Sequence, residues 1–234
     1  MKIITFITLT LLATFSFAQP GLYKDGFEEW ENESKTNKRL LPRYGHLTKT
    51  SGEINSDSAF IKEIMSQPKF KTRHEASNHL IGLGFQYFYQ DDLKAAMYRF
   101  NQAYLLDTLN TDIFWGYGAI YMRFGMLGLA ADQYKTGLRI DSTNTHLLTD
   151  LGTMFQAQYY RLEFPESLDS AIYYMNKSFE INSKDQNTLF KLSVCHWNKG
   201  DCKNAWKFYN LCKAQGGQPI TEEYTKDLKA KCKK

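Results

Sequence analysis

The chain has 234 residues, of which 43% are hydrophobic and 15% aromatic, and its 29 Lys and Arg against 25 Asp and Glu give a formal net charge of +4. This length suits one elongated domain with a small N-terminal extension. A charge so close to balance argues against nucleic acid as a partner, because a nucleic-acid-binding domain carries a concentrated basic patch.

The first element in chain order is a signal peptide, expected at residues 1–18. Lys2 precedes an uncharged run at residues 3–15, and Ser16 and Ala18 offer small side chains at both positions that signal peptidase reads. We expect cleavage before Gln19, a secreted or periplasmic location and no membrane span after cleavage. The apolar run is short for a spanning helix, so an uncleaved anchor is the weaker alternative.

Residues 19–71 are expected to form an N-terminal extension. Residues 42–53 have the composition of a loop, and residues 56–66 have the apolar spacing of a short helix. Two placements remain open. The extension either packs over the exposed face of the first repeat as a cap, or it lies in the groove of the repeats and occupies the binding site.

Two successive blocks of 34 residues, 77–110 and 111–144, then carry the same residue classes at the same offsets. Each block has a large apolar residue, a Gly four residues later, an aromatic, and an Ala followed after four residues by a second aromatic. The small residues let two antiparallel helices approach closely, and the aromatics fill the space around that contact. The matching positions are Leu80, Gly84, Tyr87, Ala96 and Phe100 in the first block, and Phe114, Gly118, Tyr121, Ala130 and Tyr134 in the second.

This pattern resembles the tetratricopeptide repeat (TPR) family. The resemblance implies an all-α fold, an α-solenoid of about four helical hairpins with a C-terminal cap helix, in which the array spans residues 72–219. Its units are residues 77–110, 111–144, 145–185 and 186–219, and residues 220–234 form the cap helix.

The third unit departs from the pattern by a seven-residue delay. It keeps Gly152, but the next small residue, Ala171, arrives seven positions late. Seven residues make about two helical turns, so the first helix of this unit can lengthen without rotating its buried face. Pro165 is then expected to mark a stop and a restart of the helix.

All four cysteines lie in the last 40 residues, and an exported protein meets oxidising conditions. In an antiparallel stack the start of the helix that holds Cys202 should lie beside the end of the cap helix that holds Cys232, so this pair is the preferred disulfide. Cys195 with Cys202 remains possible, whereas Cys195 with Cys212 is a poor pairing. Zinc is the weaker reading, because no C-x-x-C pair is present and only His196 lies nearby.

The resemblance also implies a concave groove lined by the first helices of the hairpins, with a protein or peptide as the partner. Large aromatics at several groove positions are not required by the packing pattern, and aromatics with Arg are typical of binding hot spots. These rings equally suit packing on the N-terminal segment or filling of a tight superhelix. The expected groove residues are Asn78, Phe85, Phe88, Tyr89, Trp115, Met122, Arg123, Thr149, Gln156, Phe190 and Trp197.

No catalytic motif is present in the sequence. His74 and His79 are five residues apart and do not share the helix face that a zinc metalloprotease needs, and no Ser or Cys has a nucleophile-elbow context. The sequence therefore predicts a non-catalytic protein-interaction scaffold of the cell envelope, with no cofactor and no metal. The alternatives are an enzyme or small-molecule binder with a pocket between the extension and the groove, and a self-association module that forms a homo-oligomer.

Overall fold

The computed structural model describes residues 25–233 of the chain. In this range the structure is built from α-helices and two short 3-10 turns, with no strand. The predicted signal peptide at residues 1–18 lies outside the described residues. The helices are α1 (Phe27–Ser34), α2 (Ser51–Met65), α3 (Arg73–Tyr89), α4 (Leu93–Leu106), α5 (Asp112–Arg123), α6 (Leu127–Ile140), α7 (Thr145–Leu162), α8 (Pro165–Ile181), α9 (Gln186–Asn198), α10 (Cys202–Ala214) and α11 (Glu222–Lys231), and the 3-10 turns are η1 (Lys38–Leu40) and η2 (Pro42–His46).

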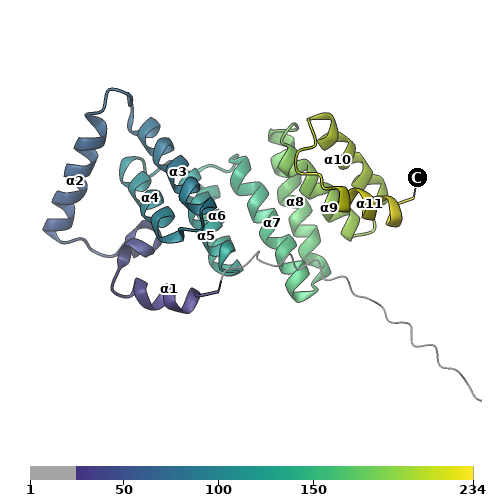
Figure 1. Ribbon diagram of the computed structural model, residues 1–234, viewed down its shortest axis with the longest axis horizontal. Helices are drawn as coiled ribbons and strands as arrows, with labels where there is room; N and C mark the ends of the chain where they lie inside the picture. The colour runs from purple at the N-terminus through teal and green to yellow at the C-terminus, as the bar shows by residue number, and fades with distance from the viewer. Residues whose placement is uncertain (1–24, 234) are drawn as a thin grey trace, which may run out of the picture.

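Helices α3 to α10 form four successive hairpins that follow one another along the long axis of the molecule (Figure 1). Each hairpin pairs two consecutive helices, from α3 with α4 to α9 with α10, and each first helix also packs on the second helix of the preceding hairpin. Helix α11 closes the C-terminal end of the stack, and α1 and α2 lie at the other end. The predicted all-α solenoid of helical hairpins is confirmed.

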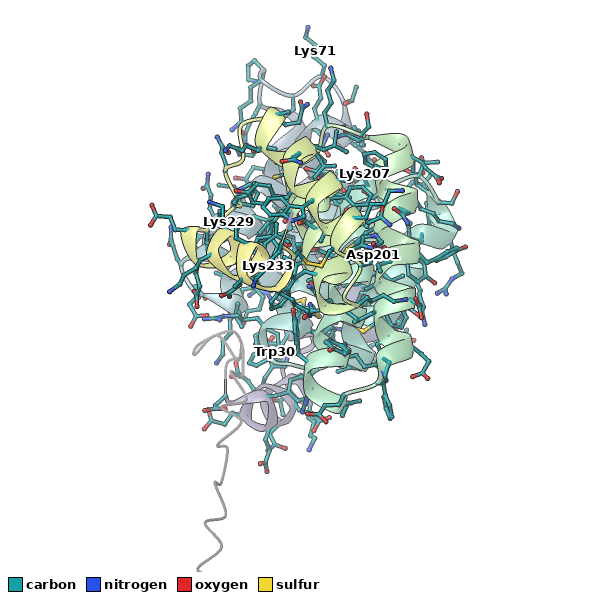
Figure 2. All side chains as sticks on the ribbon, turned by 90° about the vertical axis from the view of Figure 1, so that its right-hand side faces the viewer. Trp30, Lys71, Asp201, Lys207, Lys229 and Lys233 are labelled. Carbon is teal, nitrogen blue, oxygen red and sulfur yellow. A yellow bond between two sulfur atoms is a disulfide. The ribbon has the colours of Figure 1, made fainter. Side chains whose placement is uncertain are left out.

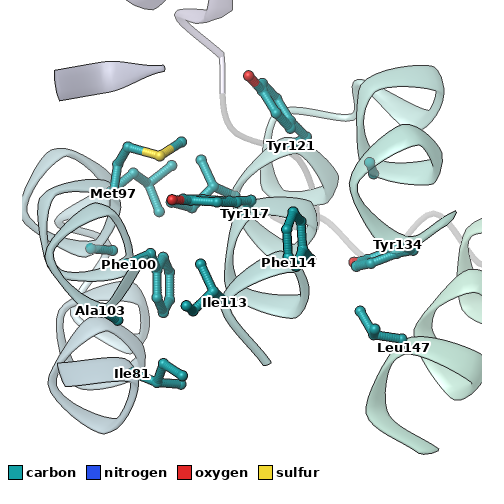
Figure 3. Close-up of a cluster of buried hydrophobic side chains, with 14 of the residues drawn as sticks. Ile81, Met97, Phe100, Ala103, Ile113, Phe114, Tyr117, Tyr121, Tyr134 and Leu147 are labelled. Atoms are coloured by element: carbon teal, nitrogen blue, oxygen red, sulfur yellow. The ribbon is translucent and has the colours of Figure 1, made fainter. Parts of the chain in front are cut away.

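Close contact between a glycine and a ring holds each of the first two hairpins together. A Cβ atom added to Gly84 would lie 2.4 Å from Cε1 of Phe100, and one added to Gly118 would lie 2.1 Å from Cε1 of Tyr134. Both rings are buried, and Figure 3 shows Phe100 and Tyr134 in the layers on either side of α5. The small residues therefore sit where the sequence pattern requires a close approach.

Asparagine side chains tie the first hairpin to the second and the second to the third. Asn144 begins α7, because its Oδ1 accepts a hydrogen bond from the Leu147 amide at 3.1 Å. Its Nδ2 donates to Asp112 Oδ1 at 2.8 Å, one repeat earlier. Asn110 repeats the second contact, with Nδ2 donating to Asn78 Oδ1 at 2.7 Å. Each of these two contacts joins residues 32 positions apart, and the two asparagines themselves are one 34-residue repeat apart.

The third hairpin is longer than the others, as predicted. Helix α7 has 18 residues against 12 in α5, and α8 begins at Pro165. Gly152 still meets its partner helix, with Met175 Cγ 2.7 Å from the position of an added Cβ. The extra turns end in a tip that exposes Tyr160, Leu162 and Phe164.

The N-terminal segment is more regular than predicted. Residues 42–53 were expected to be a loop, but they contain η2 and the start of α2. Helix α2 begins at Ser51 because Thr50 and Glu53 form a capping box: the Thr50 Oγ1 accepts from the Glu53 amide, and Glu53 Oε2 accepts from the Thr50 amide at 2.8 Å.

The segment packs mainly against α4 and α5. Asn101 of α4 donates through Nδ2 to the carbonyl oxygens of Arg39 and Leu41, at 2.8 and 3.0 Å. The Arg43 amide donates to Asn101 Oδ1 at 2.8 Å and to the Tyr117 hydroxyl oxygen at 3.2 Å. Arg43 begins a run of residues with positive φ, continuing through Tyr44, Gly45 and His46, which is a left-handed turn that L-residues adopt only under constraint.

A disulfide fixes the C-terminal cap helix. The predicted Cys202–Cys232 bond is present, with the two Cα atoms 5.2 Å apart, and it joins the start of α10 to the end of α11. Cys195 and Cys212 are free thiols inside the stack, and burial raises the pKa of the Cys195 thiol to about 12. Among residues 25–233, no helix combines the length and the apolar character needed to cross a bilayer.

Candidate functional site

The predicted groove residues lie on the first helices of the four hairpins, α3, α5, α7 and α9, and we call this surface the first-helix face. The structure brings together the residues from α3 and α5, places one residue of α7 in the interior, and covers the residues of α9 with the cap helix.

Four of the predicted rings form one continuous cluster, the aromatic row, made of Phe85, Phe88, Tyr89 and Trp115. The Phe85 ring centroid lies 4.1 Å from that of Trp115, across the gap between α3 and α5. Phe88 and Tyr89 continue the cluster, with centroids 5.6 Å apart. Tyr89 is 78% exposed, while the other three rings are half-buried. The row is thus an ordered aromatic surface with one fully accessible ring.

His146 of α7 extends the row by stacking on Trp115, with ring centroids 4.3 Å apart and planes inclined by 20°. Its Nδ1 lies 3.1 Å from Asp112 Oδ1. This hydrogen bond raises the pKa of His146 above its usual value, against the opposing effect of burial. Burial also works against the ionised form of Asp112, but hydrogen bonds from His146 and Asn144 hold the pKa of that carboxyl below its usual value.

Below the row, a carboxylate links three helices. Asp150 of α7 accepts a hydrogen bond from Trp115 Nε1 at 2.7 Å. It also forms an ion pair with Lys191 of α9, whose Nζ lies 3.5 Å from Asp150 Oδ1. Lys191 also donates to Thr153 Oγ1 at 2.6 Å. Asp150 and Lys191 were not among the expected groove residues, although each directly follows a groove position of the repeat. The network fixes the orientation of the Trp115 indole.

Thr149 does not belong to the surface. It is 3% exposed, and its hydroxyl is hydrogen-bonded to Ser178 at 2.8 Å and to Thr188 at 2.7 Å. The prediction for this residue is wrong, because the hydroxyl satisfies a buried polar contact between α7, α8 and α9.

Phe190 and Trp197 serve the cap helix. The Phe190 ring centroid lies 5.3 Å from that of Tyr224 in α11, and the Trp197 centroid lies 6.2 Å from it. Lys231 of α11 reaches over Trp197, with its Nζ 4.6 Å from the ring centroid. The two rings are therefore separated from the aromatic row and hold α11 in place.

The remaining predicted residues flank the row. Asn78 is exposed and takes part in the asparagine contacts described above. Arg123 pairs through Nε with Asp91 Oδ1 at 3.1 Å. Met122 is half-buried against the core, and Gln156 is half-buried on α7.

The N-terminal segment meets α5 on a different side from the aromatic row. Arg43 lies over the Phe114 ring, and Phe27 packs on Tyr121 with ring centroids 6.3 Å apart. Positions 114 and 121 are two turns apart on one side of the helix, whereas Trp115 is rotated by about 100° from Phe114. These contacts place the segment along α4 and on the adjoining side of α5, which corresponds to the cap placement more closely than to the groove placement.

The described residues contain no group of three or more His, Cys, Asp or Glu side chains arranged to hold a metal ion. What the aromatic row offers is contact area, ring faces and a few oriented polar groups. Such a surface can bind an apolar or aromatic side chain of a partner.

Comparison with known proteins gives structural likeness only. No protein-family model matches the sequence, and no curated protein matches it. Among solved structures, YrrB, described as a TPR protein with an unusual peptide-binding site, aligns over 68% of this chain and 75% of its own, at 23% identity and a TM-score of 0.45. MamA aligns over 74% of this chain and 98% of its own, at 15% identity and a TM-score of 0.48. The Pseudomonas aeruginosa pilF protein aligns over 61% and 78%, at 18% identity and a TM-score of 0.34.

Proposed function

We propose that this protein is a non-catalytic scaffold of the periplasm or cell envelope that binds a peptide or protein segment on the first-helix face. The observation that carries the proposal is the aromatic row, in which an exposed Tyr89 stands beside three rings that already pack on one another.

Ordered rings favour binding for an energetic reason. A side chain that is immobile before association loses little conformational entropy on binding, so more of the contact energy appears as affinity. Phe85 packs on Phe100 in the core, at a centroid distance of 5.2 Å, and Trp115 is held by Asp150. The row is therefore preorganised, and Tyr89 supplies an amphipathic ring at its edge.

Polar groups beside the row can orient a bound segment. The Asp112–His146 pair and the Asp150–Lys191 pair lie next to Trp115, and both are partly accessible. Exposed ion pairs contribute little to stability, but they can exchange partners with a ligand and select among segments. The proposed ligand is thus an apolar or aromatic anchor flanked by hydrogen-bonding groups.

The proposed location rests on sequence and chemistry together. The N-terminal 18 residues have the pattern of a signal peptide, and the Cys202–Cys232 disulfide is of a kind that persists in oxidising compartments.

A peptide-display selection on the purified protein tests the proposed site. Peptides enriched on the wild type are labelled, and their Kd values are measured by fluorescence anisotropy for wild type, Tyr89→Ala and Tyr173→Ala. Tyr173 is the matched control, because it is a 53% exposed tyrosine on α8, a second helix. Hypothesis: Tyr89→Ala weakens binding by about 1–2 kcal/mol, roughly 5- to 30-fold, as for a hot-spot aromatic. Equal affinities for all three proteins, or no enriched peptide at all, would contradict the site.

A further inference from the structure

The positive charge of the chain is concentrated at its C-terminal end. Residues 199–233 contain eight lysines and four carboxylates, and this excess equals the formal net charge of +4 of the whole chain. The rest of the sequence is therefore balanced. Figure 2 views this end of the molecule, with Lys207 on α10 and Lys229 and Lys233 at α11.

A furrow of about 350 Å³ lies in this basic region, between α10 and α11. One side is a face of α10, since positions 206, 209, 210 and 213 repeat at helical spacing. The other side is a face of α11 and the residue that follows it, with the same spacing. The lining residues are Trp206, Tyr209, Asn210, Lys213, Thr225, Lys229 and Cys232.

The walls of the furrow are fixed by contacts between the two helices. The Trp206 indole Nε1 donates to the Cys232 carbonyl oxygen at 2.8 Å, and the Tyr209 and Thr225 hydroxyls are 3.0 Å apart. Cys232, a lining residue, is also joined to Cys202 by the disulfide, which holds the end of α11 to the start of α10. Lys213 of α10 and Lys229 of α11 line the furrow from its two sides, so the charge on both sides is positive.

We propose that this furrow, which we call the basic furrow, binds an acidic segment of a partner protein, with a carboxylate between Lys213 and Lys229 and an apolar side chain against Trp206. The site is independent of the aromatic row, which lies on α3 and α5.

Other anionic partners suit the surface less well. A membrane needs apolar side chains to insert, and none of the large exposed hydrophobic side chains of the described residues lies on α10 or α11. Single-stranded nucleic acid needs several open ring faces on which successive bases stack, but Tyr209 is 6% exposed, so Trp206 is the one lining ring whose face is open. A narrow furrow with hydroxyl, amide and ammonium groups along it suits an extended acidic peptide.

The test uses the full disulfide-bonded protein and a labelled nonapeptide with one Phe flanked by four Glu on each side. Binding is measured by anisotropy from 20 to 300 mM NaCl for wild type, Lys213→Glu/Lys229→Glu and the control Lys62→Glu/Lys135→Glu. The control makes the same change in net charge at exposed lysines of α2 and α6. We expect the furrow variant to lose at least 10-fold in affinity, the control to lose less than 3-fold, and wild-type binding to weaken steeply with salt.

Two further measurements separate the possible explanations. Tyr173→Ala, which removes an exposed ring of α8 outside both surfaces, should bind the nonapeptide as wild type does, whereas Cys202→Ser/Cys232→Ser should bind it more weakly, because the end of α11 is no longer bonded to α10. The proposal is overturned if the wild type does not bind the probe at 20 mM NaCl, or if the furrow variant and the control lose affinity equally. It is also overturned if the same two lysines instead support sedimentation with phosphatidylserine vesicles.

Discussion

Gly82 and Gly118 are both helical glycines, but their surroundings are opposite. A Cβ at Gly82 would meet nothing within 4 Å, whereas a Cβ at Gly118 would overlap the Tyr134 ring, which is 1% exposed and cannot move aside. A side chain added at Gly82 therefore changes only the helix propensity, whereas a side chain added at Gly118 must fit into a packed interior.

Substituting each glycine by alanine therefore has opposite expected effects. Gly118→Ala should lower the free energy of unfolding by about 1–3 kcal/mol through overpacking. Gly82→Ala should raise it by about 0.5–1 kcal/mol, because alanine restricts the unfolded chain and favours the helix. Urea titrations followed by circular dichroism measure both. Destabilisation by both substitutions to the same extent would disprove the assigned contact of Gly118 with Tyr134.

His146 and His196 should have pKa values on opposite sides of the usual histidine value of 6.5. The hydrogen bond with Asp112 raises the pKa of His146, whereas burial lowers the pKa of His196 against the effect of Asp201. NMR titration of the ring protons measures both midpoints, and Asp112→Asn should remove the upward shift of His146. A midpoint for His146 at or below that of His196 would contradict the geometry.

The sign of the His146 effect on stability follows from linkage. A raised pKa in the folded state means that the imidazolium stabilises the fold fully at pH values below about 6.5, and that this contribution is lost as the pH rises through the folded pKa. The difference in unfolding free energy between wild type and His146→Gln should therefore be largest in acid. A difference that grows toward pH 8 would exclude the proposed contact.

At the scale of single elements, α11 is a helix of ten residues attached by a few strong contacts. Tyr224 and Leu228 are buried, and the disulfide joins its end to α10. Isolated helices of this length are only marginally stable in water, so the disulfide contributes much to keeping α11 folded against α10.

Removing the disulfide should lower the stability of the C-terminal end by about 3.5 kcal/mol, as estimated for a closed loop of 30 residues. Urea unfolding of wild type and of Cys202→Ser/Cys232→Ser, followed by tryptophan fluorescence, measures the change. Adding a reductant should shift the wild-type transition to the same midpoint and leave the variant unaffected. Identical midpoints for oxidised and reduced wild type would show that the bond does not constrain α11.

The elements that the sequence predicted well depend on local periodicity. The longer third hairpin followed from the seven extra residues between Gly152 and the delayed Ala171, because two extra turns keep the same face inward. The N-terminal segment was less predictable, because its structure depends on Asn101, some 60 residues away. Likewise, nothing local distinguishes Phe190 from Phe85; only the position of Tyr224 shows that one packs under α11.

At the scale of the whole molecule, the hairpins contact mainly their neighbours, and such stacks lose structure locally. The N-terminal segment contributes to one end alone. Trp30 is 5% exposed and packs on Phe124, and Leu40 is fully buried. The N-terminal segment should therefore stabilise only the first two hairpins.

Deleting residues 19–71 tests this expectation. Hydrogen exchange should show lost amide protection in α3 to α6, because the deletion uncovers apolar surface there, and unchanged protection in α9 and α10. The Trp30→Ala variant provides a milder version of the same change. Loss of protection that is uniform along the chain would show that the stack unfolds as one unit and would contradict a local role.

The left-handed turn at residues 43–46 bears on the order in which the chain assembles. A left-handed helical backbone costs L-residues about 1–2 kcal/mol each, so the turn has no reason to form by itself. The Arg43 amide, at the start of the turn, donates hydrogen bonds to Asn101 of α4 and to Tyr117 of α5. We therefore expect residues 43–46 to adopt this shape after α4 and α5 have docked, so that this segment is added last to hairpins that are already formed.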